Sequence, residues 1–141
     1  MKFKPYIRKV NYYETDRMSI VHHSNYIRYF EEARIYAMDQ IGCDCMDMER
    51  QNMIIPVVDV CAKYHKSLGC SDEFAVYIKM TYFNGVKMKF DYEIRFTSDN
   101  SLACTGHSTH CFVNENHKPI SIKRINPEIY NKFMLSLIHI S

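Results

Sequence analysis

The sequence lacks several features that would place it in a specialised class. No window approaches the ~20 apolar residues of a membrane-spanning helix. The basic, aromatic segment from Met1 to Arg8 has no apolar run of the kind found in signal peptides. Neither sign of charge dominates, because 18 lysines and arginines against 16 acidic residues leave a net charge of +2. A chain with this charge balance lacks the excess of basic residues that is typical of nucleic-acid-binding proteins.

Metal and disulfide motifs are also missing. None of the six cysteines forms a C-x-x-C pair, and the seven histidines are scattered. His107 and His110 lack a third ligand at suitable spacing. We therefore expect no metal site, ordinary free or buried thiols, and a cytoplasmic location.

What the sequence does contain is enough apolar material for one folded domain. It has 141 residues, of which 47% are hydrophobic, and a chain of this length buries roughly two thirds of its unfolded surface. We assign residues 1–134 to this single domain. The segment 135–141 (L-S-L-I-H-I-S) resembles a translated sequencing adapter, so we expect a non-native tail there. An ordinary amphipathic end is the alternative.

One long helix is predicted from Ser24 to about Ile41. The Ser24 hydroxyl can cap its first turn, and Gly42 suits its end because glycine adopts the left-handed conformation. Apolar residues recur at helical spacing and spread well past one face, which predicts a helix buried on most sides. The residues of the central stripe are Tyr26, Phe30, Ala33, Ala37 and Ile41.

Alternating apolar and polar residues predict a set of strands on both sides of this helix. Asn84-Gly85 is a strong hairpin signal between two of them. Short helical turns are expected in 43–52 and 127–133, and residues 119–123 are expected to pair once more. The predicted strands are Phe3–Tyr12, Ile54–Lys66, Phe74–Phe83, Val86–Thr97 and Leu102–Val113. One helix followed by an antiparallel meander is an α+β layout.

The predicted sheet is long enough to curl round the helix. Strands of this length span roughly 33–40 Å, whereas the helix is roughly 26 Å long. One open sheet leaves edges, and natural sheets rarely leave a long edge unpaired. We therefore expect two protomers to join sheet edges as a homodimer.

Ionisable residues gather just before the helix. Asp16, His22 and His23 precede a helix N-terminus, where free N–H groups and a positive dipole favour negative charge. His22 is most simply a polar loop residue.

This loop and helix resemble the hotdog-fold acyl-CoA thioesterases of the 4-hydroxybenzoyl-CoA thioesterase type. The matching pattern is D-x-x-x-x-V-x-H-x-x-Y followed by F-E-x-x-R, formed by Asp16, Val21, His23, Tyr26, Phe30, Glu31 and Arg34. The resemblance implies a hotdog fold, in which a long central helix is wrapped by a curved antiparallel sheet of about five or six strands. It also implies active sites at a homodimer interface, often within a dimer of dimers, hence a homotetramer.

The resemblance places the catalytic carboxylate at Asp16, which can act as a general base or as a nucleophile. It implies that the backbone N–H at His23 polarises the thioester carbonyl and that the imidazole accompanies the carboxylate. Tyr12 matches a tyrosine near the site in relatives, although packing explains it equally well. Glu31 and Arg34 are spaced to pair on the helix, in a mainly structural role.

One residue departs from the family pattern. Ser19 stands where the family usually has glycine, and a positive φ there would cost about 1 kcal/mol. This departure concerns the shape of the acyl pocket more than the carboxylate.

The predicted function is hydrolysis of the thioester of a small or medium acyl-CoA to the free acid and coenzyme A. The alternatives are a hotdog dehydratase or hydratase acting on acyl thioesters, and a non-catalytic acyl-CoA-binding module. No cofactor is expected, since coenzyme A enters only as part of the substrate. Coenzyme A and acyl carrier protein remain alternative carriers. Candidates to meet the phosphates of coenzyme A, or simply exposed basic residues, are Lys63, Lys66, Lys87, Lys89 and Arg124.

Overall fold

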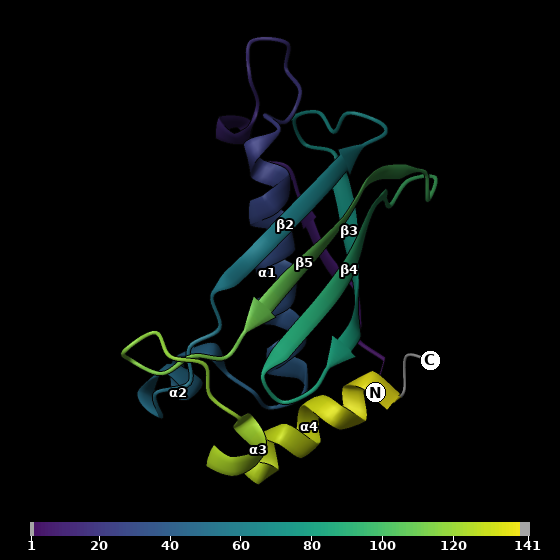
Figure 1. Ribbon diagram of the computed structural model, residues 1–141. Helices are drawn as coiled ribbons and strands as arrows, with labels where there is room; N and C mark the ends of the chain where they lie inside the picture. Colours follow the sequence, from purple (N-terminus) through teal and green to yellow (C-terminus); the bar gives the residue numbers. More distant parts are fainter. Residues whose placement is uncertain (1, 139–141) are drawn as a thin grey trace.

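The computed structural model describes residues 2–138, and its longest helix, α1 (Ser24–Gln40), lies against a curved sheet (Figure 1). The strands are β1 (Tyr6–Lys9), β2 (Val57–Tyr64), β3 (Glu73–Phe83), β4 (Lys87–Phe96) and β5 (Leu102–Cys111). The smaller helices are η1 (Tyr12–Glu14), α2 (Cys45–Arg50), α3 (Ile122–Ile125) and α4 (Pro127–Ile138). The predicted α+β layout with one long helix and five strands is confirmed.

All five strands run antiparallel in the order β1-β3-β4-β5-β2. The turn between β3 and β4 falls at Asn84-Gly85, as predicted, and Gly85 has a φ of 92°. The Asn84 Oδ1 atom accepts hydrogen bonds from the backbone N–H groups of Val86 and Lys87 at 2.9 and 2.7 Å. The asparagine side chain therefore fixes the register of the longest strand pair.

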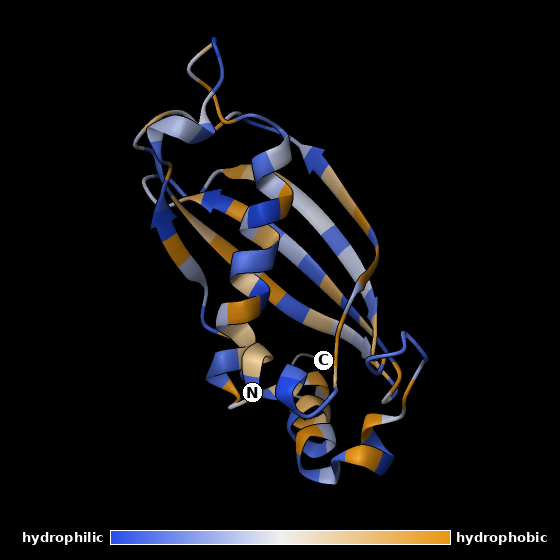
Figure 2. Ribbon diagram, turned by 90° about the vertical axis from the view of Figure 1, so that its left-hand side faces the viewer, coloured by the Kyte–Doolittle hydropathy of each residue, from blue (hydrophilic) through white to orange (hydrophobic). Residues whose placement is uncertain are grey.

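The inner face of α1 packs on the sheet at one close approach. The Phe30 ring stacks on Tyr92 of β4, with ring centroids 4.3 Å apart. Gly106 of β5 lies directly beneath Phe30, because a Cβ atom there would stand 2.5 Å from the ring and 2.6 Å from the Cys61 carbonyl oxygen. Glycine is therefore required at this point of β5. Figure 2 shows α1 crossing the sheet, with hydrophobic and hydrophilic residues alternating along the strands behind it.

The outer side of α1 is exposed, so the prediction of a helix buried on most sides is wrong. Ile27, Ile35 and Tyr36 are exposed in the single subunit. Three apolar side chains remain available to another surface.

The edge strands are shorter than predicted. The first strand covers only Tyr6–Lys9 rather than Phe3–Tyr12, because Asn11 is the N-cap of η1 and the chain turns there. Strand β2 covers Val57–Tyr64 rather than Ile54–Lys66. Residues 119–123 make one bridge, between Val113 and Pro119, before α3 begins.

Helix α4 lies across the end of the sheet (Figure 1). Phe133 is fully buried among Phe83 and Phe112. The helix extends through Ile138, into the segment predicted to be a non-native tail, whereas residues 139–141 lie outside the described part of the chain. Of the described helices, none combines the length and apolar character needed to cross a membrane.

Candidate active site

The predicted residues Asp16 and His23 line one cavity of about 260 Å³ at the N-terminus of α1. Asp16 comes from the loop before the helix, whereas His23 is the residue immediately preceding its first turn. The other lining residues are Ile20, Val21, Tyr26, Tyr64, His65, Lys66 and Ser67. The cavity thus combines a carboxylate with the positive end of the longest helix.

Backbone hydrogen bonds hold the Asp16 loop in a tight turn. The Asp16 N–H donates to the Ile20 carbonyl at 2.8 Å, and the Ser19 N–H donates to the Asp16 carbonyl at 3.0 Å. The Asp16 Oδ1 atom accepts a hydrogen bond from the Met18 N–H at 2.8 Å. The side chain is exposed, so its second oxygen is accessible to water and substrate.

Ser19, which stands where the family usually has glycine, has a positive φ. Its φ is 62°, in the left-handed region where a non-glycine residue is strained by roughly 1–2 kcal/mol. The backbone turn characteristic of glycine is therefore retained in this loop with serine in place.

A buried carboxylate anchors this loop to the rest of the fold. The Glu14 Oε1 atom accepts hydrogen bonds from Arg8 Nη2 at 2.5 Å, the Asn11 N–H at 2.8 Å and the Tyr29 hydroxyl at 3.0 Å. Burial, and then the hydrogen bond to Glu14, raise the pKa of Tyr29, so its hydroxyl stays protonated and donates. The Glu14 carbonyl accepts the His22 N–H at 2.9 Å. One residue therefore ties both ends of the Asp16 loop to β1 and α1.

The N-terminus of α1 has a backbone donor without a partner at a residue that lines the cavity. Within the part of the chain that the structure describes, the His23 N–H makes no hydrogen bond, whereas the Asn25 and Tyr26 N–H groups donate to the carbonyls of His22 and His23. A free N–H at a helix N-terminus is suited to an oxyanion.

The predicted cap of α1 is wrong. His23 occupies the cap position, and Ser24 is the first helical residue without capping a backbone N–H. Its hydroxyl instead contacts His22 Nδ1 at 2.8 Å. The family's E-x-x-R pairing is not formed either, because the Arg34 guanidinium donates to the Tyr92 hydroxyl at 3.0 Å and has no ion pair with Glu31 among the described residues.

Tyr12 does not join the other two predicted residues. It lies in η1 with 82% of its surface exposed and does not line the cavity in the single subunit. Its place near the site therefore stays a prediction.

Sequence reasoning missed one wall of the cavity. Tyr64, at the end of β2, donates from its hydroxyl to the His23 carbonyl at 3.2 Å and packs edge-on against Tyr26. His65 and Lys66 follow it along the same wall. A local sequence motif does not predict this contact, since 41 residues separate Tyr64 from His23.

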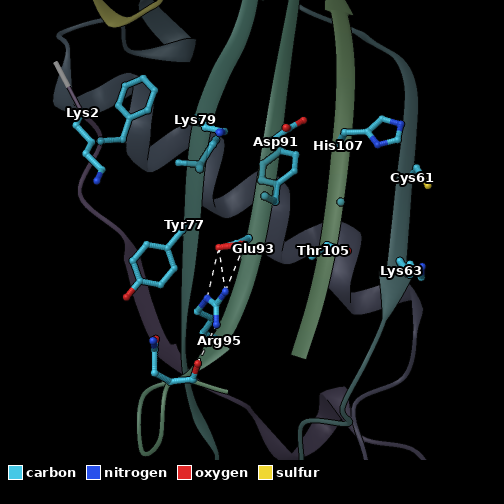
Figure 3. A pocket seen from close by; sticks show the side chains of 15 residues that line it. Lys2, Cys61, Lys63, Tyr77, Lys79, Asp91, Glu93, Arg95, Thr105 and His107 are labelled. Atoms are coloured by element: carbon cyan, nitrogen blue, oxygen red, sulfur yellow. Dashed lines mark hydrogen bonds and ion pairs between the residues drawn. The ribbon is translucent and has the colours of Figure 1, made fainter. Parts of the chain in front are cut away.

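A larger hollow than the Asp16 cavity lies elsewhere. About 920 Å³ in volume, it lies on the outer face of the sheet, where Figure 3 shows polar side chains from β2 to β5 with α1 behind them. Glu93 and Arg95 form an ion pair there at 3.4 Å. Neither Asp16 nor His23 lines this hollow. We therefore interpret it as the polar, solvated face that antiparallel sheets commonly carry.

Comparison with known proteins gives consistent matches. Residues 10–133 match the model of the thioesterase-like superfamily. The Bacillus subtilis protein named "Putative acyl-CoA thioesterase YneP" is 31% identical over 126 residues, which cover 89% of this chain and 91% of that protein. The crystal structure of a DHNA-CoA thioesterase from Staphylococcus aureus superposes with a TM-score of 0.91 at 28% identity, over 96% of this chain and 91% of the other. A hypothetical protein from Aquifex aeolicus superposes with a TM-score of 0.84 at 30% identity, over 92% and 98% of the two chains.

Proposed function

Because the chain belongs to the thioesterase-like superfamily and is a thioester hydrolase of the hotdog fold, we propose that Asp16 and the N-terminus of α1 form its catalytic centre. The observation that carries the proposal is the cavity lined by both Asp16, whose carboxylate is exposed, and His23, whose backbone N–H makes no hydrogen bond to a described residue. The substrate we propose is the thioester of a small or medium acyl-CoA.

Asp16 supplies the chemical step in one of two ways. As a general base, its carboxylate takes a proton from a water molecule while the water oxygen bonds to the thioester carbon. As a nucleophile, the carboxylate oxygen bonds to that carbon and forms a mixed anhydride, which water then hydrolyses. In both routes the carbon–sulfur bond breaks and the thiol leaves as a thiolate, since its pKa is near ~8.5.

The backbone N–H of His23 supplies the second requirement. Negative charge develops on the carbonyl oxygen as the thioester is attacked, and a preorganised donor stabilises it. The dipole of α1 adds to this effect because the N–H lies at the positive end of the helix. His23 also lines the cavity with Asp16, which is compatible with its imidazole assisting the carboxylate.

The names of two relatives indicate which carrier holds the acyl group of their substrates. One is called an acyl-CoA thioesterase and another a DHNA-CoA thioesterase. Both names specify coenzyme A as the carrier, and a relative named an acyl-acyl carrier protein thioesterase is less similar, at 21% identity; this order supports acyl-CoA as the substrate here. The two names do not decide between an aliphatic and an aromatic acyl group for this protein.

We propose that the working unit is a homodimer, or a dimer of dimers, in the cytoplasm. Among the described residues, β2 pairs only with β5, so its other edge is free. Val57 and Val58 on β2 are exposed, as are Ile27 and Ile35 on α1. Joining two β2 edges would cover an unpaired strand with a second copy of itself. The free state of all six cysteines supports a reducing compartment.

The proposed centre is tested by measuring thiol release from a panel of acyl-CoA thioesters. We expect Asp16→Asn to lower kcat/KM by about 10²- to 10⁴-fold, the usual contribution of a general base. Asp39→Asn is the matched control, because Asp39 is an exposed carboxylate on α1 outside the cavity. Hydrolysis by Asp16→Asn at the parental rate would refute the assignment.

The assembly is tested separately by analytical ultracentrifugation. A charge on the free edge, introduced as Val58→Lys, should shift the protein from dimer to monomer. Lys79→Arg on the outer face of the sheet should leave the dimer unchanged. A Val58→Lys protein that sediments as the parent does would argue against pairing through β2.

A further inference from the structure

A chain of buried polar side chains connects the middle of α1 to the end of β5, away from the Asp16 cavity. The Arg34 guanidinium donates to the Tyr92 hydroxyl at 3.0 Å, which contacts the Ser108 hydroxyl at 2.6 Å. Ser108 in turn contacts His110 Nε2 at 2.8 Å. Arg34 is 9% exposed and His110 is 1% exposed.

The direction of the hydrogen bonds along this chain follows from its first member. A guanidinium has only donors, so the Tyr92 oxygen accepts from Arg34, and its own proton is used on Ser108. The Ser108 oxygen then accepts from Tyr92, and its proton goes to His110 Nε2. This order gives every buried hydroxyl proton an acceptor. It makes Nε2 an acceptor and places the imidazole proton on Nδ1.

That Nδ1 atom is unsatisfied. Among the described residues it is the one buried side-chain nitrogen or oxygen without a hydrogen-bond partner. Burial and then the charge of Arg34 lower the pKa of His110 to about 4, and the nearby backbone of Pro56 and Ile55 opposes this shift. Those backbone groups do not meet Nδ1 in hydrogen-bonding geometry. A neutral ring therefore presents an N–H donor that lies near the Pro56 and Ile55 backbone but makes no hydrogen bond to a described residue.

Arg34 also has N–H groups that donate to no described residue. Its one hydrogen bond to a described residue is to Tyr92, and no described carboxylate forms an ion pair with it. The other nitrogens of its guanidinium are not among the buried atoms without a partner, so they are reached by solvent. The remaining N–H groups of Arg34 and the Nδ1–H of His110 are thus both available to donate to a ligand.

Both side chains line one cavity. Its volume is about 220 Å³, and it lies between α1, α2 and the segment that leads into β2. Apolar side chains form most of its wall, namely Ile35, Met38, Met53, Ile54, Ile55 and Pro56. The exposed acids Glu31 and Glu49 also contribute to the lining, together with Cys45.

We infer that this cavity binds a carboxylate, whose oxygens accept hydrogen bonds from the Arg34 guanidinium and from Nδ1–H of His110. A planar carboxylate matches the fork of donors that arginine presents. Glu31 and Glu49 repel any anion in proportion to its charge, and Arg34 is the single cation among the described lining residues, so phosphate is disfavoured more strongly than a carboxylate. The apolar wall suits the carbon chain that carries the carboxylate.

Two sources supply such a group: a free carboxylate that binds by itself, or the far end of an acyl thioester. The second source rests on the proposed function, whereas the first does not. Between His23 and Arg34 the helix rises about 16 Å, so both short and long acyl chains belong in the test.

The first experiment uses the intact protein and no thioester. Sodium acetate at about ten times its dissociation constant should raise Tm by about 4 °C relative to sodium chloride of equal ionic strength. Arg34→Met should weaken acetate binding roughly 10- to 100-fold, the value of a charged hydrogen bond. It should also fold, because replacing a buried charge by an apolar side chain of similar volume is often tolerated. Arg28→Met, an exposed arginine of α1 outside the cavity, should respond to acetate as the parent does.

The second experiment identifies the source. Succinyl-CoA is compared with butanoyl-CoA, and dodecanedioyl-CoA with dodecanoyl-CoA. If the acyl group carries the carboxylate, one acid-ended substrate has the lower KM in the parent and loses that advantage in Arg34→Met. If neither pair differs while acetate still binds through Arg34, the ligand is a free carboxylate.

Three results would overturn the inference: no stabilisation by acetate beyond that of chloride, equal stabilisation of Arg34→Met, or greater stabilisation by phosphate. Failure to hydrolyse any thioester would instead count against the proposed function. It would leave the acetate result standing.

Discussion

The loop that carries Asp16 depends on the buried carboxylate of Glu14, so replacing this residue by glutamine is a direct test of how the site is held. The substitution Glu14→Gln keeps the shape of the side chain and removes its charge. The amide oxygen can take the position of Oε1, where three donors converge at 2.5, 2.8 and 3.0 Å. The variant therefore isolates the contribution of the negative charge.

The expected cost follows from those contacts. Hydrogen bonds to a charged group contribute about 1 kcal/mol more than neutral ones, which gives an upper value of about 3 kcal/mol for three. Arg8 is not left unpaired, because Glu32 also accepts from its guanidinium at 3.0 Å. A neutral side chain is also cheaper to bury. We therefore expect a loss of about 2 kcal/mol in the free energy of unfolding.

Urea denaturation followed by circular dichroism at pH 7 measures this loss. Glu32→Gln is the matched control, because it removes a carboxylate from the same arginine at a more exposed position, where an ion pair contributes about 1 kcal/mol or less. Below the unfolding transition, kcat of Glu14→Gln should fall about tenfold or more, since displacing a catalytic group by ~1 Å costs up to 10²-fold. Parental stability and parental kcat together would show that Glu14 does not hold the loop.

Three further predictions concern single residues. Ser19→Gly should be more stable than Ser19→Ala by about 1 kcal/mol in urea denaturation, because the φ of 62° favours glycine; the reverse order would contradict the observed backbone. Gly106→Ala should lose about 3 kcal/mol or more, since its Cβ would overlap the Phe30 ring and the Cys61 carbonyl; near-parental melting would be incompatible with that packing. The pKa of His110 is lowered to about 4 in the folded state from about 6.5 when unfolded, so the unfolded chain binds the proton first as pH falls. The stability that neutral His110 contributes is therefore complete above pH ~6.5 and should fall by about 2 kcal/mol between pH 7 and pH 5; a His110→Asn protein with the same pH dependence would exclude this residue as its cause.

Much of the central sheet is predictable from the alternation of residues. The bounds of β3 and β4 agree with prediction to within one residue at each end, because both strands have a partner on each side and one buried face. The edge strands β1 and β2 were predicted too long. An edge strand pairs on one side only, and its pattern does not reveal where that pairing stops.

In the candidate site, too, some residues are predictable from the sequence and others are not. Asp16 and His23 are close in sequence, so a local motif places them together. Tyr64 reaches His23 across 41 residues, and Arg34 reaches Tyr92 across 58. Contacts of this kind depend on the register of the sheet and on how α1 crosses it, neither of which a local pattern specifies. The exposed Ile27 and Ile35 show a further limit, since an apolar residue does not reveal whether its own subunit or another one covers it.

Both described ends of the chain lie at the opposite end of α1 from Asp16 (Figure 1). The Lys4 N–H donates to Gln40 at 2.7 Å, and Lys132 of α4 reaches the Gly42 carbonyl at 3.4 Å. The cavity opens about 26 Å away, at the other end of the helix. A fusion partner, an affinity tag or a covalent link to a solid support can therefore be attached near either end while the Asp16 cavity stays clear.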